Sequence, residues 1–406
     1  MVDFDFEPAL LQRQQTFHAV AEQMMRPISR QYDEHEHARP RQFEEQMWNA
    51  ARMLGGVRGH VGEHQPQAGT ELKSVLNCLV TEELCWGDAG LFLSIPGPGL
   101  GGAAVMAAGT PEQKERFLRR FREGEPKWSA MAITEPGCGS DSAAITTRAR
   151  REGDFWVING TKIFCTSGQL AVEQSEGFVV VWATLDPALG RAAIKPFVVE
   201  HHTPGMSVLR VENKMGIRAS NTTALVFEDC RVPLDNLLGS PEIKPAGGFK
   251  DVMATFDATR PVVAAMAIGV GRAALDFLGQ FLSQQGITIR YGLSRQRLSA
   301  LEREFMDMEV QLKAARLLAW RAAWLVDRSR RNNLEASMAK AKAGAAVTRI
   351  TQKAVELMGP LGYSRQYLVE KWMRDAKITD IFEGTQQINL LIVARRILGY
   401  GSRELS

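Results

Sequence analysis

The chain has few of the residues that mark disulfide-rich or metal-binding proteins. Its 406 residues include five cysteines and seven histidines. The cysteines are odd in number and widely spaced, so we interpret them as reduced thiols and expect a cytosolic compartment. His35-Glu36-His37 lacks the spacing of a zinc motif and lies in a highly charged stretch, which favours a solvated turn or helix face. No metal site is therefore predicted.

An excess of charge of one sign is also missing. The 49 basic and 46 acidic residues give a formal net charge of +3 and are spread along the chain. Without a basic stripe, binding to nucleic acid is set aside.

Long uncharged apolar runs are absent as well. The longest, Pro261 to Gly271, ends at Arg272 and is too short to span a bilayer. The acidic start, Met1 to Asp5, has neither a signal-peptide core nor an Arg-rich transit pattern. A cytoplasmic protein without a membrane span is expected.

The chain is long enough for two or three domains. Apolar residues recur at helical spacing up to about residue 125, strand-like runs follow from Trp128, and long helical patterns return after Pro245. We predict a mainly helical α+β protein with an N-terminal helical domain (1–126), a β-barrel or sandwich domain (127–240) and a C-terminal four-helix bundle (241–406). The bundle helices are predicted at Thr259–Gln284, Leu298–Arg330, Leu334–Met358 and Gln387–Leu398.

Three local signals refine this outline. Thr110 can cap a helix that begins with Pro111, and Gln113 falls at the capping-box position. Asn159-Gly160, between two β-rich runs, predicts a type I′ hairpin turn. The segment Leu317–Trp324 is apolar nearly all round, which indicates packing against another subunit as well as within the bundle.

The stretch around Glu383 carries the strongest chemical signal. Glu383 stands between Phe382 and Gly384, so its side chain can face an apolar cavity while the glycine allows close approach of another molecule. A carboxylate partly removed from water is harder to ionise and suits a general base. The alternative is an ordinary loop residue before a helix capped by Thr385 or Asp380.

The surrounding residues distinguish these alternatives. Glu370-Lys371-Trp372-Met373-Arg374-Asp375-Ala376-Lys377, then Ile381 to Thr385, then Leu391 to Arg395 closely resemble the C-terminal signature of the acyl-CoA dehydrogenase family, of the medium- and short-chain type. The resemblance covers about residues 10 to 400. It implies FAD as cofactor, an acyl-CoA substrate and Glu383 as the base that abstracts the α-proton. It further implies Gly384 and Arg395 at the substrate, and Thr385 and Gln387 at FAD.

Two segments of the β region extend the resemblance. Ile133-Thr134-Glu135-Pro136-Gly137-Cys138-Gly139-Ser140-Asp141 is a glycine-rich turn that could bind the polar edge of a ring, or could be a plain β-turn. It is similar to the family motif that covers the flavin, which implies that Met131, Ile133 and Thr134 contact FAD and Ser140 contacts substrate. Phe164 stands where the family has Trp near the flavin ring, and Thr166 is the residue implied at flavin N5.

Asp257 and Arg260 lie one helical turn apart, so an ordinary surface pair is the simplest interpretation. By the resemblance they line the acyl-CoA site. Some members carry the base on this helix, but here no Glu occurs between Met253 and Val263, which leaves Glu383.

The chain departs from the family pattern in two FAD-binding segments. Arg290 is retained where the family reaches FAD across a subunit interface, but the Phe-Gly pair after it is lost. Glu356 replaces a common Gln, and the turn from Gly359 contains Pro360, which removes a backbone donor.

The resemblance also implies a homotetramer and an electron-transfer flavoprotein as electron acceptor. Three alternatives stay open. The first is an oxidase or flavin monooxygenase of the same fold. The second is a non-catalytic subunit of a heteromeric dehydrogenase, and the third is a substrate carried on a carrier protein.

Overall fold

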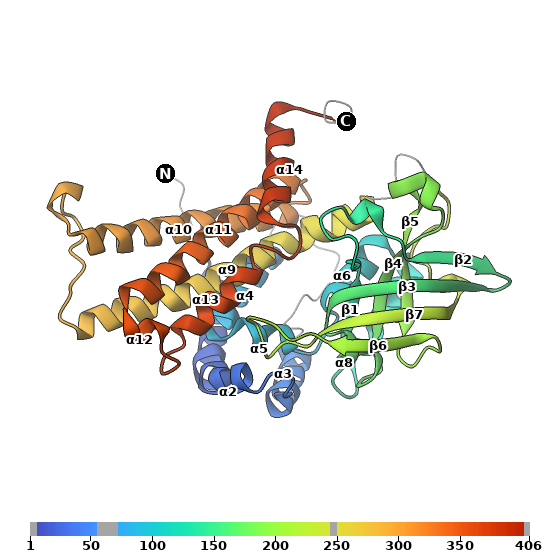
Figure 1. The fold of residues 1–406 in the computed structure, drawn as a ribbon, viewed down its shortest axis with the longest axis horizontal. Helices are drawn as coiled ribbons and strands as arrows, with labels where there is room; N and C mark the ends of the chain where they lie inside the picture. Colours follow the sequence, from blue (N-terminus) through green and yellow to red (C-terminus); the bar gives the residue numbers. More distant parts are fainter. Residues whose placement is uncertain (1–5, 55–71, 244–249, 402–406) are drawn as a thin grey trace.

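The computed structural model describes residues 6–54, 72–243 and 250–401, which form a group of long helices beside a curled sheet (Figure 1). The N-terminal part is helical, as predicted. Its helices are α1 (Pro8–Val20), α2 (Ser29–Glu34), α3 (Arg41–Leu54), α4 (Lys73–Gly87), α5 (Ala89–Ser94), α6 (Gly99–Ala108) and α7 (Pro111–Leu118). The predicted capping box of α7 is confirmed, since Thr110 and Gln113 each accept a hydrogen bond from the other's backbone N–H.

The β region is a seven-stranded sheet. Its strands are β1 (Ser129–Ala132), β2 (Arg148–Glu152), β3 (Phe155–Thr166), β4 (Phe178–Thr184), β5 (Ile194–Glu200), β6 (Met206–Val211) and β7 (Thr222–Pro233). The order is β1-β4-β2-β3-β7-β6, and β5 pairs with β4. The sheet is mostly antiparallel, but β1 runs parallel to β4. A short helix, α8 (Gly168–Val172), joins β3 to β4 along the chain.

The hairpin predicted at Asn159-Gly160 is wrong. These residues lie inside the continuous strand β3, which pairs with β7 on both sides of a register shift at this point. The Asn159 side chain bonds Asp229 on β7, and a Cβ at Gly160 would lie 2.4 Å from Thr147 Oγ1. The dipeptide therefore makes a bulge rather than a turn. The actual two-residue turn joins Glu152 to Phe155.

The C-terminal part confirms the predicted bundle; three helix ranges shift by one to three residues, and α9 begins nine residues before the predicted Thr259. Its helices are α9 (Lys250–Gln284), α10 (Ala300–Asp327), α11 (Asn333–Leu357), α12 (Pro360–Tyr363), α13 (Val369–Ile378) and α14 (Gln386–Leu398). The prediction did not include α13. Its apolar residues Val369, Trp372 and Ala376 fall at three- and four-residue spacing and are buried, so the signal for this helix was present.

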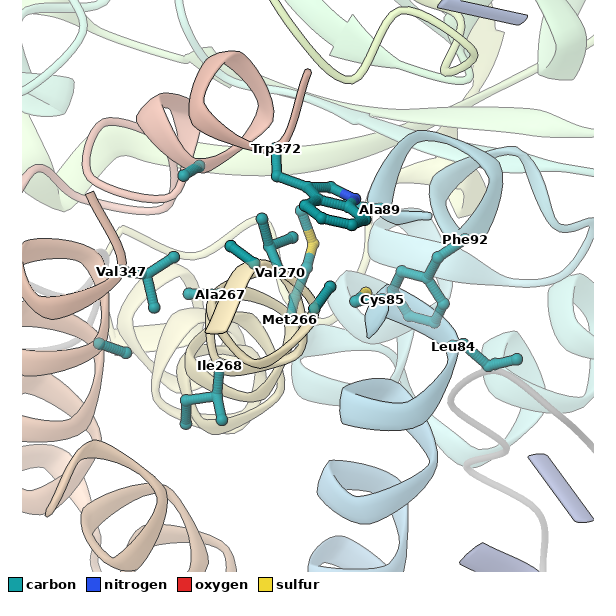
Figure 2. Close-up of a cluster of buried hydrophobic side chains, with 14 of the residues drawn as sticks. Leu84, Cys85, Ala89, Phe92, Met266, Ala267, Ile268, Val270, Val347 and Trp372 are labelled. Carbon is teal, nitrogen blue, oxygen red and sulfur yellow. The ribbon is translucent and has the colours of Figure 1, made fainter. Parts of the chain in front are cut away.

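Helix α9 is the centre of the helical part. It packs against α4, α10 and α11 and carries a large share of the main apolar core, which Figure 2 shows around Met266, Ile268 and Val270. Among the described residues it is the one helix long and apolar enough to cross a membrane, but 72% of that run is buried inside the protein. Its apolar character thus serves the core.

A buried ionic cluster fixes α13, the helix that leads to Glu383. Lys371 lies between Asp375 and Asp88, with Nζ to Oδ2 distances of 2.5 and 2.7 Å. Burial lowers the pKa of Lys371, but the two carboxylates outweigh it and the pKa rises above its usual value. Asp375 also accepts the backbone N–H of Ile217 at 2.5 Å. One cluster thereby joins α13, the N-terminal helices and the loop before β7.

The contact between α4 and α9 depends on a glycine. A Cβ at Gly269 would lie 2.3 Å from the Glu82 carbonyl oxygen, which cannot move away without shifting α4. We expect Gly269→Ala to destabilise the protein by about 1–3 kcal/mol through overpacking. Gly279→Ala in the same helix is the control. Its Cβ would meet only the Phe305 ring, at 3.3 Å. Urea unfolding followed by circular dichroism measures both, and an unchanged midpoint for Gly269→Ala would contradict the packing argument.

Candidate active site

Glu383 lies in the connection between α13 and α14, on a strained turn. Its φ is +52° and that of Gly384 is +90°, so two successive residues adopt left-handed backbone angles. For a residue with a side chain this conformation costs roughly 1–3 kcal/mol and persists only where its surroundings enforce it. Thr385 caps α14, because its hydroxyl accepts the N–H of Ile388 at 3.2 Å. The helix cap therefore follows the chemical candidate by two residues.

Side chains from α9 hold Glu383. Thr259 Oγ1 donates to the Glu383 carboxylate at 2.5 Å, and Arg260 Nε lies 3.5 Å from the Glu383 carbonyl oxygen. Gly384 presents its carbonyl oxygen to Lys340 Nζ at 2.5 Å and to Asn389 Nδ2 at 2.8 Å. Both the carboxylate and the backbone that carries it are thus fixed by the bundle.

Asp257 and Arg260 form a partly buried pair rather than a surface pair. Arg260 Nη1 lies 3.1 Å from Asp257 Oδ1, and the Arg260 side chain is almost fully buried. Asn333 of α11 donates to both Asp257 oxygens and accepts from Arg396 of α14. Burial raises the pKa of Asp257, opposed by Asn333 and Arg260. Burial also lowers the pKa of Arg260.

The turn after β1 is anchored by a buried ion pair. Lys162 Nζ lies 2.8 Å from Glu135 Oε1, and the Glu135 carboxylate also accepts hydrogen bonds from Thr146 and Thr147. Burial pushes the pKa of Glu135 upward, but Lys162 and the threonine donors outweigh it and lower the pKa to about 2. Glu135 is therefore a structural anchor of the glycine-rich turn.

The same anchor brings the two β segments together. Ile163 N–H donates to the Thr134 carbonyl at 2.9 Å, and Lys162 Nζ donates to the Ile133 carbonyl at 3.0 Å. Phe164 is 60% exposed and has a φ of +56°, while Thr134 and Thr166 are half-buried. An aromatic ring thus stands at the surface close to two hydroxyl-bearing residues. Met131 is buried in the core behind them, and Ser140 is exposed.

The β side and the Glu383 side meet through Phe256. This α9 residue packs in the same apolar cluster as Met131 and Ile133. It stands one turn before Thr259 and Arg260, which contact Glu383. The candidate site therefore lies where the start of α9 approaches both the turn after β1 and the Glu383 turn.

Three predicted residues lie away from the Glu383 turn, and two more are exposed on α14. Arg290 forms a two-pronged pair with Glu302 at the start of α10, and Glu356 pairs with Lys353. Arg290 belongs to the connection between α9 and α10, and Glu356 and Gly359 flank the turn between α11 and α12; these segments lie at the end of the bundle away from the sheet (Figure 1). Gln387 and Arg395 are exposed on α14. On that helix it is Arg396 that contacts Asn333.

Several residues that hold the site from the surrounding helices were not predicted from the sequence. They are Thr259, Asn333, Lys340, Asn389 and Arg396. Only the polar pair Asn332-Asn333 at a helix start gave a local signal. His35-Glu36-His37 has a structural role instead, because Glu36 bonds the Lys214 backbone and Arg218 at 2.6 and 2.9 Å.

The Glu135 anchor predicts a pH dependence of stability. The pKa of Glu135 is about 2 in the folded protein against an ordinary 4.5. The ionised anchor therefore contributes stability above pH 4.5, and the contribution is lost as the pH falls toward 2. Glu135→Gln should be less stable than wild type at pH 6, and the gap should narrow between pH 4.5 and 2.5. Urea unfolding of both proteins across this pH range tests the prediction, with Glu125→Gln, at an exposed position, as the control. A difference in the free energy of unfolding that stays constant with pH would contradict it.

Known protein families and relatives match nearly the whole chain. Family models for the N-terminal, middle and C-terminal domains of acyl-CoA dehydrogenase match residues 8–125, 130–230 and 246–398. The mitochondrial short-chain specific acyl-CoA dehydrogenase of Bos taurus is 38% identical over 386 residues, covering 95% of this chain and 89% of the relative.

Solved structures agree with the sequence relatives. Butyryl-CoA dehydrogenase from Megasphaera elsdenii has a TM-score of 0.84 at 32% identity, with 98% of this chain and 100% of that chain covered. A chain from a structure that concerns the electron transferring flavoprotein of Acidaminococcus fermentans has a TM-score of 0.82 at 31% identity, with 98% and 100% covered. This chain belongs to the acyl-CoA dehydrogenase family, whose members are FAD-using oxidoreductases.

Proposed function

We propose that this protein oxidises an acyl-CoA thioester to the trans-2-enoyl-CoA, with Glu383 as the base. The observation that carries the proposal is the Glu383 turn, in which a half-buried carboxylate is held by Thr259 on a strained backbone. Backbone strain of this kind gathers at functional sites, which supports a functional role for this carboxylate. The carboxylate takes the α-proton of the substrate while a hydride leaves the β-carbon, and the double bond forms between the two carbons.

The α-proton of a thioester is only weakly acidic, so its carbonyl must be polarised. We assign this to the backbone N–H of Glu383, as the family resemblance implies. Arg260 contacts the carbonyl oxygen of Glu383 and so helps to keep this backbone in one conformation. The same residue supplies the base and a donor, so their relative position is fixed by a single turn.

The residues at the β side fit FAD. Phe164 offers an exposed ring, and Thr134 and Thr166 place half-buried hydroxyl-bearing side chains close to it. We assign Met131, Ile133, Thr134, Phe164 and Thr166 to the flavin end of the site, with Thr385 and Gln387 as further contacts. When bound, FAD would accept the hydride from the β-carbon. Phe164 keeps an aromatic surface at a position where the family usually has Trp.

We infer that Arg290, Glu356 and Gly359 serve the FAD of a second subunit. The segments that carry them lie at the other end of the bundle from the connection between α13 and α14, which carries Glu383 (Figure 1). Assembly as a homotetramer would bring such residues to a neighbouring site. Exposed apolar side chains on the bundle support assembly, because contiguous apolar surface marks interaction sites. They are Val310, Leu317 and Trp324 on α10 and Leu390, Leu391, Ile397 and Leu398 on α14.

For the substrate we propose a short-chain acyl-CoA. The short-chain specific and butyryl-CoA dehydrogenases among the relatives support this choice. We assign Ser140, Asp257, Arg260, Gly384 and Arg395 to substrate binding. We further propose that the electrons leave to an electron-transfer flavoprotein, which the similarity to a chain from the Acidaminococcus fermentans structure supports.

The base assignment predicts the behaviour of Glu383→Gln. The amide cannot accept the α-proton, so flavin reduction by butyryl-CoA should fall by at least about 10²- to 10⁴-fold while FAD stays bound. Anaerobic bleaching of the visible flavin spectrum measures this. Glu304→Gln is the control, because Glu304 is paired with Arg349 between α10 and α11 and has no part in the proposed reaction. Near-normal reduction in Glu383→Gln would refute the role of Glu383, and a colourless wild-type protein would favour a non-catalytic subunit.

The assembly proposal predicts a mass near four times 45.0 kDa, about 180 kDa, by light scattering. The double change Leu391→Glu and Ile397→Glu should give smaller species, since it places charge on an apolar face that we assign to an interface. Leu189→Glu, on an exposed leucine of the β region, is the matched control and should keep the wild-type mass. A monomeric wild type would reject the proposal.

A further inference from the structure

Lys340 lies in α11 with its residue only 1% exposed, and the reaction steps above give it no role. Its ammonium donates to the Gly384 carbonyl oxygen at 2.5 Å, which belongs to the peptide directly after Glu383. A buried charge costs free energy unless it is bonded and compensated. The hydrogen-bond acceptor of Lys340 is a neutral peptide oxygen. A methionine of similar length would fill the same space without the cost of a buried charge, so packing alone does not explain a lysine here.

The turn needs support from outside its own segment. Two successive left-handed residues, Glu383 and Gly384, relax readily unless their carbonyls are held. The second donor to the Gly384 carbonyl is Asn389, which belongs to α14 and is only five residues away along the chain. Lys340 comes from another helix, so it ties the turn to the body of the bundle.

Helix α11 is also shaped to approach this turn closely. One turn after Lys340, a Cβ at Gly344 would lie 3.0 Å from the Thr379 carbonyl oxygen and 3.1 Å from Asp380 Cα. A glycine therefore lets the backbone of α11 reach the segment that precedes Glu383. Lys340 and Gly344 act on the two ends of the same connection.

The charged groups that act on Lys340 come from two other parts of the chain, the connection between α13 and α14 and helix α9. They are Asp380 and Glu383 of the connection and Arg260 of α9. Burial lowers the pKa of Lys340 to about 8, while the two carboxylates oppose this and Arg260 adds to it. The ammonium is thus mostly charged at neutral pH and stands beside the proposed base.

We propose that Lys340 is a positioning residue for the reaction, which holds the Gly384 carbonyl and so orients the Glu383 carboxylate toward the substrate α-carbon. The inference rests on the proposed function of Glu383. Lys340 exchanges no proton with substrate and acts through the backbone of the turn. A displacement of a reacting group by about 1 Å can lower a rate by about 10²-fold.

The test uses the tetramer-competent full chain with FAD bound and compares Lys340→Met, Lys340→Gln and a matched control. The control is Lys342→Met, because Lys342 lies on the same helix and bonds Gln311 of α10 instead. Two rates are measured with butyryl-CoA: flavin reduction at saturating substrate, and exchange of the substrate α-protons with D₂O followed by NMR. The exchange reports proton abstraction without flavin reduction. Thermal melts and flavin content report the fold.

We expect Lys340→Met to lower both rates by about 10- to 100-fold, with KM changed much less than kcat. Lys340→Gln keeps a donor and should recover part of the loss, and Lys342→Met should match wild type. Wild-type rates in Lys340→Met would overturn the proposal. A loss of rate that is matched by an equal loss of folded, flavin-containing protein would also overturn it, because the effect would then be on the fold. If Lys340→Met does not fold, the same two rates in Lys340→Gln decide. A wild type that no acyl-CoA reduces would instead reject the proposed function itself.

Discussion

The left-handed turn formed by Glu383 and Gly384 is the constraint on which the site depends. A short connection between α13 and α14 would not adopt it unaided, because the backbone angles of Glu383 are unfavourable for a residue with a side chain. Thr259 and Arg260 of α9 and Lys340 of α11 hold it from two helices. The bundle therefore does more than bury apolar surface, since it supplies the hydrogen bonds that keep one carboxylate in place.

Buried charges fix the elements that lead to this turn. Lys371, Asp375 and Asp88 join α13 to the N-terminal helices, and Asp375 reaches the loop at Ile217. Glu135 and Lys162 do the same for the glycine-rich turn on the β side. Removing one partner of such a pair leaves the other charge buried and unpaired, which is strongly unfavourable. The Glu135–Lys162 pair fixes the turn on the β side, and the bond from Ile217 to Asp375 links α13 to the β region.

The fold could be predicted from the sequence because its signals are local or periodic. Helical spacing, the Thr110 capping box and the change to strands at Trp128 all reappear in the structure. The Asn159-Gly160 prediction was wrong for a physical reason. A dipeptide that favours a turn has no means of indicating that β7 will pair with both of its flanks, and the close packing against Thr147 requires glycine for a different purpose.

For the site, the sequence by itself determined the chemical groups: a carboxylate beside a glycine, an Asp and Arg one helical turn apart, and motifs in the order of one enzyme family. Which groups touch was decided only by the tertiary structure. Thr259 lies 124 residues from Glu383, and Lys340 lies 44 residues from Gly384. Contacts between segments so far apart in the chain leave no local or periodic pattern in the sequence, because each depends on how separately formed helices pack together.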